Sequence, residues 1–497
     1  MQAASGPTRP APAPHRRPVA AEGTTGLSEA RDARRRGAIT GPAGADARTG
    51  IVAVILTVFV MAMIVPIFFH VGTLRLSPVR ILLLVSVIPL ALALLQGRAG
   101  PLRAADLFIG LHCLWIGVAL IVVEGADRIP FAGITVVELG GGYLVGRVLV
   151  RNSAEFARLV AVFLTSLAIL APFAVIEFLT DIRPLQIAAG TIAETFDKFD
   201  SSRGRLGFHR VMAGFEHPIL FGLYACIALG HVLYLTRWSP GRRALAAAGV
   251  SAMTFMALSS APLLALIIQF GLWLWDRTTG GRWALLGLLA VLVYVALDLA
   301  SNRTPLTLLI HYLTFDAHTG YIRLVIFDYG FAAALANPVF GIGMGDWPRP
   351  AWLTESVDNF WLVTVMRYGF PALVFLVTGV VLGTLAILRA RLADPVARNQ
   401  RTGYMISLAA IFVTLATVHM WGAVSVFVMM WLGAGMWMAD AGTPGAASPA
   451  PDRRRGTTTP PADAPAPAGT AAPDAPRSRF TRQRKTHPRT PAGGPGA

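Results

Sequence analysis

Residues 157–179 read ARLVAVFLTSLAILAPFAVIEFL, an apolar run in which Arg158 and Glu177 are the charged residues. A helix needs about 20 such residues to cross a hydrocarbon core of roughly 30 Å. Similar runs recur along the middle of the 497-residue chain, which is 54% hydrophobic and 14% charged. This composition lies outside the range of soluble domains. The sequence therefore predicts an all-α integral membrane protein.

About twelve runs of this kind are predicted to form transmembrane helices. The fourth is the least regular, because VELGGGYLVGR carries a carboxylate and three adjacent glycines. The predicted helices fall into three groups, at residues 50–179, 213–300 and 359–438. Their individual ranges are 51–69, 80–96, 105–123, 131–149, 157–179, 213–236, 243–258, 261–276, 282–300, 359–388, 402–419 and 421–438.

The two flanking segments, residues 1–49 and 439–497, have a different composition. The first is basic and lacks the apolar stretch of a cleavable signal peptide, so the first predicted helix is expected to be a retained anchor. The second is rich in Pro and Ala and buries too little apolar surface to fold. Both are predicted to be disordered tails, and much of the +16 formal charge lies in them. No folded module accompanies this charge, which favours contact with anionic headgroups and not with nucleic acid.

Basic residues between the predicted helices indicate an orientation, because short cytoplasmic loops collect Lys and Arg. Arginines occur in every second loop, which predicts that both termini are cytoplasmic. The loop with Arg75 and Arg80 is the exception. The arginines that follow the rule are Arg98, Arg103, Arg147, Arg151, Arg158, Arg237, Arg242, Arg243, Arg277, Arg282, Arg389, Arg391, Arg398 and Arg401.

In this orientation two extracytoplasmic loops are long, residues 180–212 and residues 301–358. Long loops in a compact architecture are usually functional. The first carries Arg203, Arg205 and Arg210, whose guanidinium groups suit phosphate oxygens. The alternative is that these arginines lie among lipid headgroups or pair with nearby acids, for which the candidates are Asp197, Asp200 and Glu216.

The second long loop has helical apolar spacing over residues 320–335, which predicts an interfacial helix that carries Arg323. Asn337-Pro338 ends this helix, and GIGMG follows. A nucleotide-binding glycine loop would need a preceding strand, so Gly341 and Gly343 are interpreted as a tight backbone path that permits positive φ and close approach.

Ionisable residues and cysteines inside the predicted helices have alternative roles. Glu138 and Glu177 are costly in a membrane and are functional hypotheses by default. Otherwise Glu138 pairs with Arg147 and Glu177 reaches the outer interface. Cys113 and Cys226 lack partners at ligand spacing and are expected to be packing residues. The sequence has no HExxH, CxxC or DxD pattern, and neither a metal nor another cofactor is expected.

Three motifs together resemble a known family. Residues 337–347 read NPVFGIGMGDW, and they are followed by Asp358-Asn359 and by WLVTVMRYGFPALVF at 361–375. With the helix of Arg323 before them, they resemble the C-terminal signature of the O-antigen ligase and Wzy-type polysaccharide polymerase family. Two earlier segments, YLVGRVLV at 143–150 and RVMAGFEHPILFG at 210–222, resemble others in that family.

The resemblance implies a multi-pass enzyme of the bacterial inner membrane. Such an enzyme transfers an oligosaccharide from undecaprenyl diphosphate to a hydroxyl group, on lipid A core for a ligase and on another carrier-linked glycan for a polymerase. Arg210 and Arg323 match the arginines that hold the diphosphate. Six further residues are expected to contribute to substrate binding: Arg203, Arg205, His217, Asn359, Gly341 and Gly343. A chain-length regulator or export machinery is an expected partner, together with membrane lipids.

One residue departs from the family pattern. Where many members have a histidine before Asn359, this chain has Asp358. Asp358 is able to accept a proton from the attacking hydroxyl, or the Asp-Asn pair caps the helix that follows. His217, His311 and His318 are alternative bases, although lone histidines at an interface are more often structural.

The departure at Asp358 and the lack of an evident lipid A site favour a polymerase of exported polysaccharide over an O-antigen ligase. A transporter of lipid-linked glycans and a scaffold for other polysaccharide enzymes are the further alternatives. A transporter is disfavoured because no internal repeat is evident and the polar residues gather on one predicted face.

Overall fold

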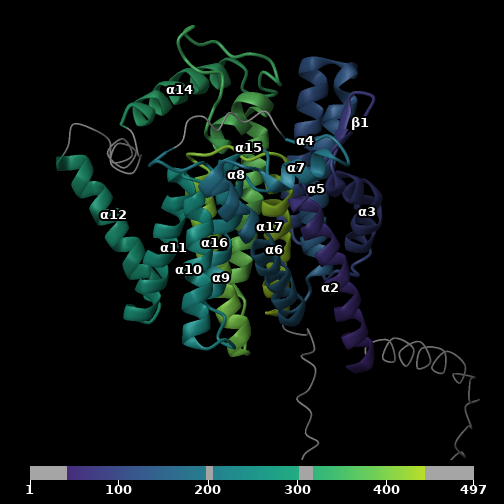
Figure 1. The fold of residues 1–497 in the computed structure, drawn as a ribbon, viewed down its shortest axis with the longest axis vertical. Coiled ribbons are helices and arrows are strands. Elements are labelled where there is room, and N and C mark those ends of the chain that lie inside the picture. Colours follow the sequence, from purple (N-terminus) through teal and green to yellow (C-terminus); the bar gives the residue numbers. More distant parts are fainter. Residues whose placement is uncertain (1–41, 197–204, 301–316, 443–497) are drawn as a thin grey trace, which may run out of the picture. The chain divides into compact units, whose positions relative to one another are not determined.

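The computed structural model describes residues 42–196, 205–300 and 317–442, and Figure 1 shows their arrangement. Most of these residues are helical. In chain order the elements are α2 (Pro42–Ile64), β1 (Phe69–Val71), β2 (Leu74–Leu76), α3 (Pro78–Leu95), α4 (Ala104–Glu124), η1 (Ala126–Arg128), α5 (Ile129–Leu149), α6 (Ser153–Thr180), α7 (Pro184–Gly190), α8 (Pro218–Cys226), α9 (Ala228–Leu233), α10 (Pro240–Met256), α11 (Ser260–Thr279), α12 (Trp283–Ala300), α14 (Ala317–Ala336), α15 (Phe360–Arg389), α16 (Pro395–Thr414) and α17 (Gly422–Ala441).

Each of the twelve predicted ranges overlaps a helix of the structure. In the described part of the chain, seven helices are long and apolar enough to cross a membrane: α3, α4, α5 with η1, α6, α12, α15 and α17. The chain is therefore an all-α, multi-pass membrane protein, and twelve spans stay a prediction. The sixth predicted range, 213–236, contains the two short helices α8 and α9, which meet at Ile227.

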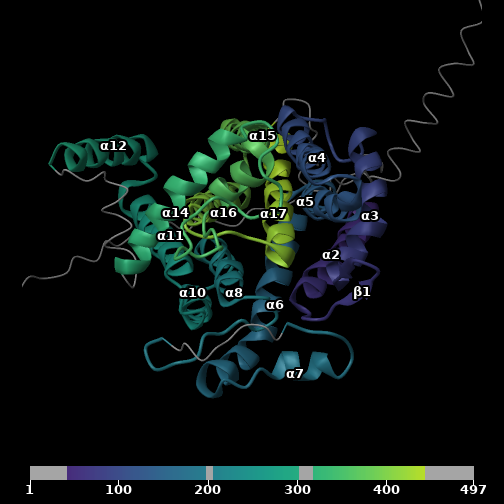
Figure 2. The same ribbon diagram turned by 90° about the horizontal axis from the view of Figure 1, so that it is seen from above.

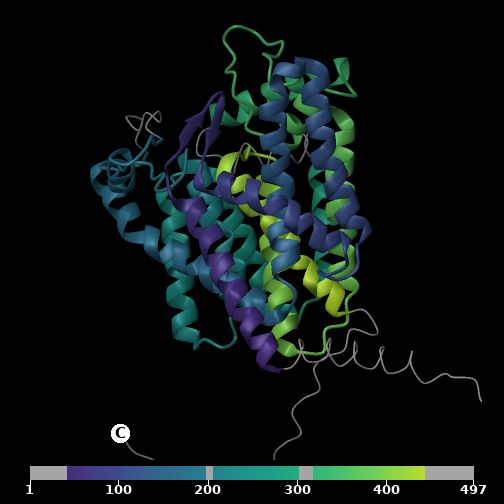
Figure 3. The ribbon, with the colours of Figure 1, turned by 90° about the vertical axis from the view of Figure 1, so that its right-hand side faces the viewer.

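The hairpin of β1 and β2 was not predicted. Its three-residue strands pair in antiparallel register, with Phe69 opposite Leu76, and it follows directly from α2 in Figure 3. Strands this short have too little periodicity to be recognised among apolar runs. Arg75 lies in this hairpin and forms an ion pair with Glu216 at 3.3 Å. Arg80 forms one with Glu138 at 2.7 Å.

Helix α17 lies in the middle of the bundle (Figure 2) and is almost entirely buried. Its close approach to α5 depends on glycines of both helices. A Cβ atom on Gly146 would lie 1.9 Å from the carbonyl oxygen of Met430, and one on Gly433 would lie 2.1 Å from that of Tyr143. Gly142, one of the three adjacent glycines of the fourth predicted helix, is a further contact position, since a Cβ atom on it would lie 2.7 Å from the carbonyl oxygen of Val426. Small residues are typical of such contacts between membrane helices. The helices that contact α17 are α2, α5, α6, α8, α15 and α16.

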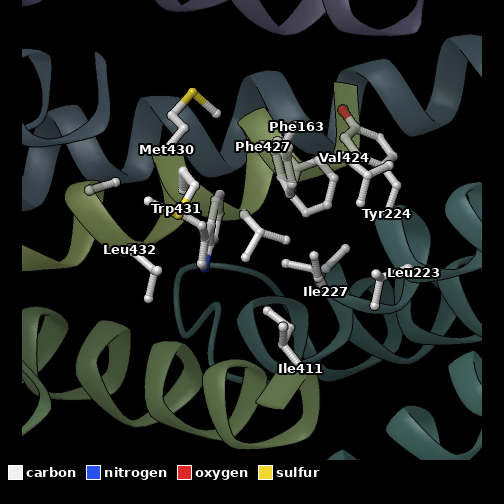
Figure 4. Packing of buried hydrophobic residues seen from close by; sticks show 14 of the residues in the cluster. Phe163, Leu223, Tyr224, Ile227, Ile411, Val424, Phe427, Met430, Trp431 and Leu432 are labelled. Atoms are coloured by element: carbon white, nitrogen blue, oxygen red, sulfur yellow. The ribbon is translucent and has the colours of Figure 1, made fainter. Parts of the chain in front are cut away.

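Aromatic side chains fill the space around the middle of α17 (Figure 4). Phe163 of α6 contacts Tyr224 of α8 and Phe427 of α17, with ring centroids 4.9 and 4.7 Å apart. Trp431 continues this cluster and is fully buried. Each of these rings removes a large apolar area from its surroundings, and edge-to-face pairs add about 0.5–1.5 kcal/mol. This core fixes α17, whose first residues reach the site described below.

A buried ion-pair network joins the first turn of α4 to the last turns of α5 and α17. Arg147, only 1% exposed, donates to Asp106 and Asp440, each at 2.9 Å. The hydroxyl of Tyr143 also donates to Asp106 at 2.6 Å. The suggested pairing of Glu138 with Arg147 was therefore wrong, because Arg147 is satisfied at this end of the helices and Glu138 pairs with Arg80.

Both cysteines, Cys113 and Cys226, are buried and unbridged in the apolar core. They are packing residues, as the sequence indicated. Of the other sequence predictions, Arg203, His311 and nearly all of the two tails lie outside the described residues, and His318 lies in a part of α14 whose side chains are not described.

Candidate functional site

The segment NPVFGIGMGDW is bound to a break in α15. At Gly369 the helix has φ +79° and ψ 171°, and Pro371 follows. The carbonyl oxygens of Met366 and Arg367, released by the break, accept hydrogen bonds from the backbone N–H groups of Ile342 and Gly343, at 2.8 and 3.0 Å. The segment of residues 337–347 and the broken helix α15 thus satisfy each other's backbone hydrogen-bonding groups.

Gly341 and Gly343 are part of this contact and do not line the cavity described below. Their φ angles are +71° and +64°, a backbone conformation that is unfavourable for residues with a Cβ atom. A Cβ atom on Gly341 would lie 2.5 Å from the carbonyl oxygen of Met366, and one on Gly343 would lie 2.5 Å from Glu124. The structure thus shows these glycines packed against α15 and α4.

Helix α14 packs on α15 through an apolar cluster that includes Ile326, Ala334, Leu362 and Met366. This packing positions Arg323, whose side chain is 18% exposed, with its Nη2 atom 3.7 Å from Oδ2 of Asp358. The Nε atom of Arg323 has no hydrogen-bond partner among the described residues. A buried guanidinium donor without a partner marks a place where an anion can bind.

A cavity of about 640 Å³ lies beside this pair. Five of the predicted site residues line it and come from segments far apart in the sequence. The remaining lining includes apolar side chains. The predicted residues are Arg205, Arg210, His217, Arg323 and Asp358, and the apolar ones are Leu206, Ile219, Leu258 and Val418.

Four helices begin at this cavity. His217 caps α8 and Asp358 precedes the cap of α15, while Ser259 and Trp421 stand at the cap positions of α11 and α17. All four residues line the cavity. The N-terminal end of a helix carries roughly half a positive charge and presents unpaired N–H groups. The helix ends and the arginines therefore favour an anion at the same place.

The charge of Arg210 is preserved despite its surroundings. Burial and the neighbouring Arg205 lower its pKa to about 10, while Asp358 opposes this shift. Arg210 is therefore positively charged at neutral pH. Its Nε donates to the carbonyl oxygen of Ala257 at 3.4 Å, and Arg205 donates to that of Leu258 at 3.0 Å.

Glu216 does not pair with these arginines, because it binds Arg75 and accepts a hydrogen bond from the indole nitrogen of Trp421 at 3.0 Å. Asn359, a predicted substrate-binding residue, is the cap of α15, and its Oδ1 accepts from Leu362 N at 3.0 Å. Capping thus falls to Asn359, and Asp358 faces Arg323.

Glu177 holds the segment that carries Arg210. Its carboxylate is 1% exposed and accepts the backbone N–H groups of Met212 and Ala213, each at 3.0 Å. Ala213 has φ +47°, a conformation that costs energy outside glycine. Glu177 therefore stays inside the fold, where it holds this backbone segment.

We expect Glu177→Ala to lower the free energy of unfolding by about 3 kcal/mol, because two hydrogen bonds to a charged group are each worth roughly 1.5 kcal/mol or more. Thermal unfolding of the purified protein in detergent measures this loss. Glu194→Ala is the control, because the Glu194 carboxylate is 61% exposed and pairs with His70. Equal melting temperatures for the two variants would contradict the role of Glu177.

His217 is the cap of α8, where its Nδ1 accepts the N–H of Ile219 at 3.1 Å. Burial, together with the repulsion of Arg210 and Arg205, lowers its pKa to about 4. His217 is therefore neutral at pH 7, with a hydrogen on its other ring nitrogen.

This shift predicts a pH dependence of stability. Between pH 6.5 and about 4 the unfolded chain binds a proton at His217 that the folded chain does not, so stability falls as pH falls through this window. His217→Asn keeps a good capping residue without a titrating group. The melting temperature should therefore drop less in His217→Asn than in wild type when pH is lowered from about 8 to about 5. An equal drop in both would contradict the shift.

Two further residues of the cavity, His419 and Trp421, were not predicted. They lie on the connection between α16 and α17, which the sequence prediction divided between two spans at 402–419 and 421–438. Their rings stack with centroids 5.9 Å apart. The available signal was the segment HMW at residues 419–421, which places a histidine and a tryptophan at the end of an apolar run, where interfacial aromatic residues are common.

A second, smaller pocket of about 150 Å³ adjoins the cavity. Asp358, His419, Trp421 and Ser356 line both. The smaller pocket is otherwise lined by residues of the 342–357 segment and of α15, including Trp347 and Arg367. The GIGMGDW segment thus reaches the site through this pocket, where Ile342 and Gly345 contribute.

No protein-family model matches the sequence, and no curated protein matches it either.

Proposed function

We propose that this protein is a polysaccharide polymerase of the bacterial inner membrane. It transfers an oligosaccharide from undecaprenyl diphosphate to a hydroxyl group of a carrier-linked glycan. The observation that carries the proposal is the convergence of Arg205, Arg210 and Arg323 with four helix N-termini on one cavity of about 640 Å³. The apolar part of the lining suits the first units of a lipid chain.

In the proposed reaction, a hydroxyl oxygen of the acceptor attacks the anomeric carbon that carries the diphosphate. The new carbon–oxygen bond forms as the bond to the diphosphate breaks, and the electron pair leaves on the phosphate oxygen. Arg210 and Arg323 stabilise the charge that grows there, a role that fixed donors perform without reorganisation. This positive charge lets the displacement proceed without a metal ion.

Asp358 accepts the proton that the hydroxyl loses, which balances the step. It lies 3.7 Å from Arg323 and accepts a hydrogen bond from the hydroxyl of Ser356 at 3.2 Å, so its position is fixed from both sides. Attack opposite the leaving diphosphate inverts the configuration of the anomeric carbon. The proposal includes about twelve spans, cytoplasmic termini and a site on the outer face of the membrane.

The test is glycan transfer by the purified protein in lipid nanodiscs, with undecaprenyl diphosphate-linked repeat units and EDTA present. The proposal predicts lipid-linked chains longer than one repeat. Transfer that occurs only when lipid A core is supplied would show that the protein is an O-antigen ligase and not a polymerase. Movement of the carrier across the bilayer without any glycan transfer would show that the protein is a transporter.

A further inference from the structure

The wall between the two pockets is built around Trp421. This residue, His419, Asp358 and Ser356 line both the cavity and the smaller pocket. Trp421 is the largest of the four, and it stands at the first turn of α17, the helix at the centre of the bundle. Its backbone is extended, with φ −148°, and Gly422 turns the chain into the helix with φ +56°.

The orientation of Trp421 is fixed by a chain of contacts that lies outside both pockets. The indole N–H donates to Oε2 of Glu216 at 3.0 Å. Oε1 of Glu216 accepts from Arg75 at 3.3 Å. The guanidinium of Arg75 in turn lies over the rings of Phe68 and Phe196, 3.8 and 4.7 Å from their centroids. The hydrogen bond is made by the indole N–H at the edge of the half-buried ring, so the face of the ring can still contact a ligand in the pockets that it lines.

The smaller pocket has the chemistry of a sugar site. Aromatic surfaces come from Trp347 and Trp421, and hydrogen-bonding groups come from Glu355, Asp358 and Arg367. A pyranose ring presents apolar C–H faces and hydroxyl edges, which match such a lining. The pocket of about 150 Å³ is much smaller than the cavity that holds the arginines.

The position of Asp358 assigns the two pockets to the two substrates. The donor sugar is bonded to the diphosphate and must lie with it in the arginine-lined cavity. The attacking hydroxyl must approach from the opposite side of the anomeric carbon and lie beside Asp358. Because Asp358 lines both pockets, the acceptor occupies the smaller one.

We propose that the smaller pocket binds the terminal sugar of the acceptor glycan, which stacks on Trp421, and that Glu216 and Arg75 are positioning residues for this ring. The inference rests on the proposed function and adds the acceptor subsite to it. The probe for this subsite is the oligosaccharide released by mild acid from the lipid-linked repeat units, which lacks the diphosphate.

Kinetics of transfer to this oligosaccharide separate the two pockets. Trp421→Ala should raise the KM for the oligosaccharide by about tenfold, as expected for the loss of about 1.4 kcal/mol of stacking. Because Trp421 also lines the cavity assigned to the donor, the KM for the lipid-linked donor should rise too, but by less. Trp421→Phe keeps a ring and should lie between this variant and wild type. Glu216→Ala should raise the same KM at unchanged kcat, and Glu216→Gln, which can still accept from the indole, should restore much of the loss. Trp352→Ala is the control, because Trp352 is 65% exposed and lines neither pocket.

Binding of the same oligosaccharide, measured by saturation-transfer NMR on the protein in nanodiscs, tests the inference without any transfer. Wild type and Trp352→Ala should give a signal that Trp421→Ala loses. An equal signal from Trp421→Ala, or none from wild type, would overturn the acceptor subsite. Absence of transfer by a wild-type protein that still binds the oligosaccharide would instead overturn the polymerase and leave the sugar pocket standing.

Discussion

Arg323→Ala is expected to reduce the rate of glycan transfer by at least about a hundredfold, the effect of removing one fixed donor from a developing oxyanion. Arg323 has a buried Nε without a partner among the described residues, and it lies 3.7 Å from Asp358. Its loss therefore removes charge from the leaving diphosphate and one neighbour from the proposed base. Arg210→Ala should show a loss of the same order, because Arg210 is the second cation proposed to contact the diphosphate.

The matched control is Arg128→Ala. Arg128 pairs with Glu124 at 2.7 Å, is 53% exposed and does not line the cavity. Its removal should leave the transfer rate within about twofold of wild type, since the Arg128 side chain is half exposed, away from the cavity, and ion pairs with an exposed partner contribute little. If Arg323→Ala folds normally and transfers at the wild-type rate, the arginine is not part of the reaction.

Gly369→Ala is expected to prevent accumulation of folded protein. The residue has φ +79°, and a Cβ atom on it would lie 1.9 Å from the carbonyl oxygen of Val339. The substitution thus combines an unfavourable backbone conformation with a backbone clash, and each costs more than about 1 kcal/mol. The NPVFGIGMGDW segment would have to leave the break in α15, which removes the bonds at Ile342 and Gly343.

Yield and monodispersity after detergent extraction measure this effect. Gly110→Ala is the control, because Gly110 lies in α4 with no atom within 4 Å of an added Cβ. That variant should be as stable as wild type or slightly more stable, since alanine is the better helix former. A folded, monodisperse Gly369→Ala protein would show that the break does not need glycine.

The class of fold and the helical segments were predictable because a membrane imposes a simple rule on composition and length. The same rule does not distinguish short structural elements that lie within or beside apolar sequence. The β1–β2 hairpin and the junction of α8 and α9 at Ile227 lie within or beside apolar sequence, and nothing in the residue pattern separates them from continuous helix. The span count depends on such features, which is why it stays a prediction.

Arg205 and Arg210 were predicted from positive charge in a loop that the distribution of arginines predicts to be extracytoplasmic. Arg323 and Asp358 were predicted from the resemblance to a known family. Arg205, Arg210, Arg323 and Asp358 come together at the cavity.

The supporting residues were harder to predict, because their roles depend on partners distant in sequence. Glu177 was a functional candidate and instead holds the backbone at Met212 and Ala213. Trp421 was assigned to an apolar span, although its indole bonds to Glu216, 205 residues earlier in the chain. A pattern within one segment contains no information on such pairings.

In the proposed reaction the arginine-lined cavity binds a lipid diphosphate. Native mass spectrometry of the detergent-purified protein with added undecaprenyl diphosphate tests it most directly, with undecaprenyl monophosphate as the weaker competitor. Wild type and Arg128→Ala should each retain one undecaprenyl diphosphate, and the double variant Arg210→Ala/Arg323→Ala should retain none. Equal retention by the folded double variant would show that the lipid binds elsewhere and would contradict the proposed site.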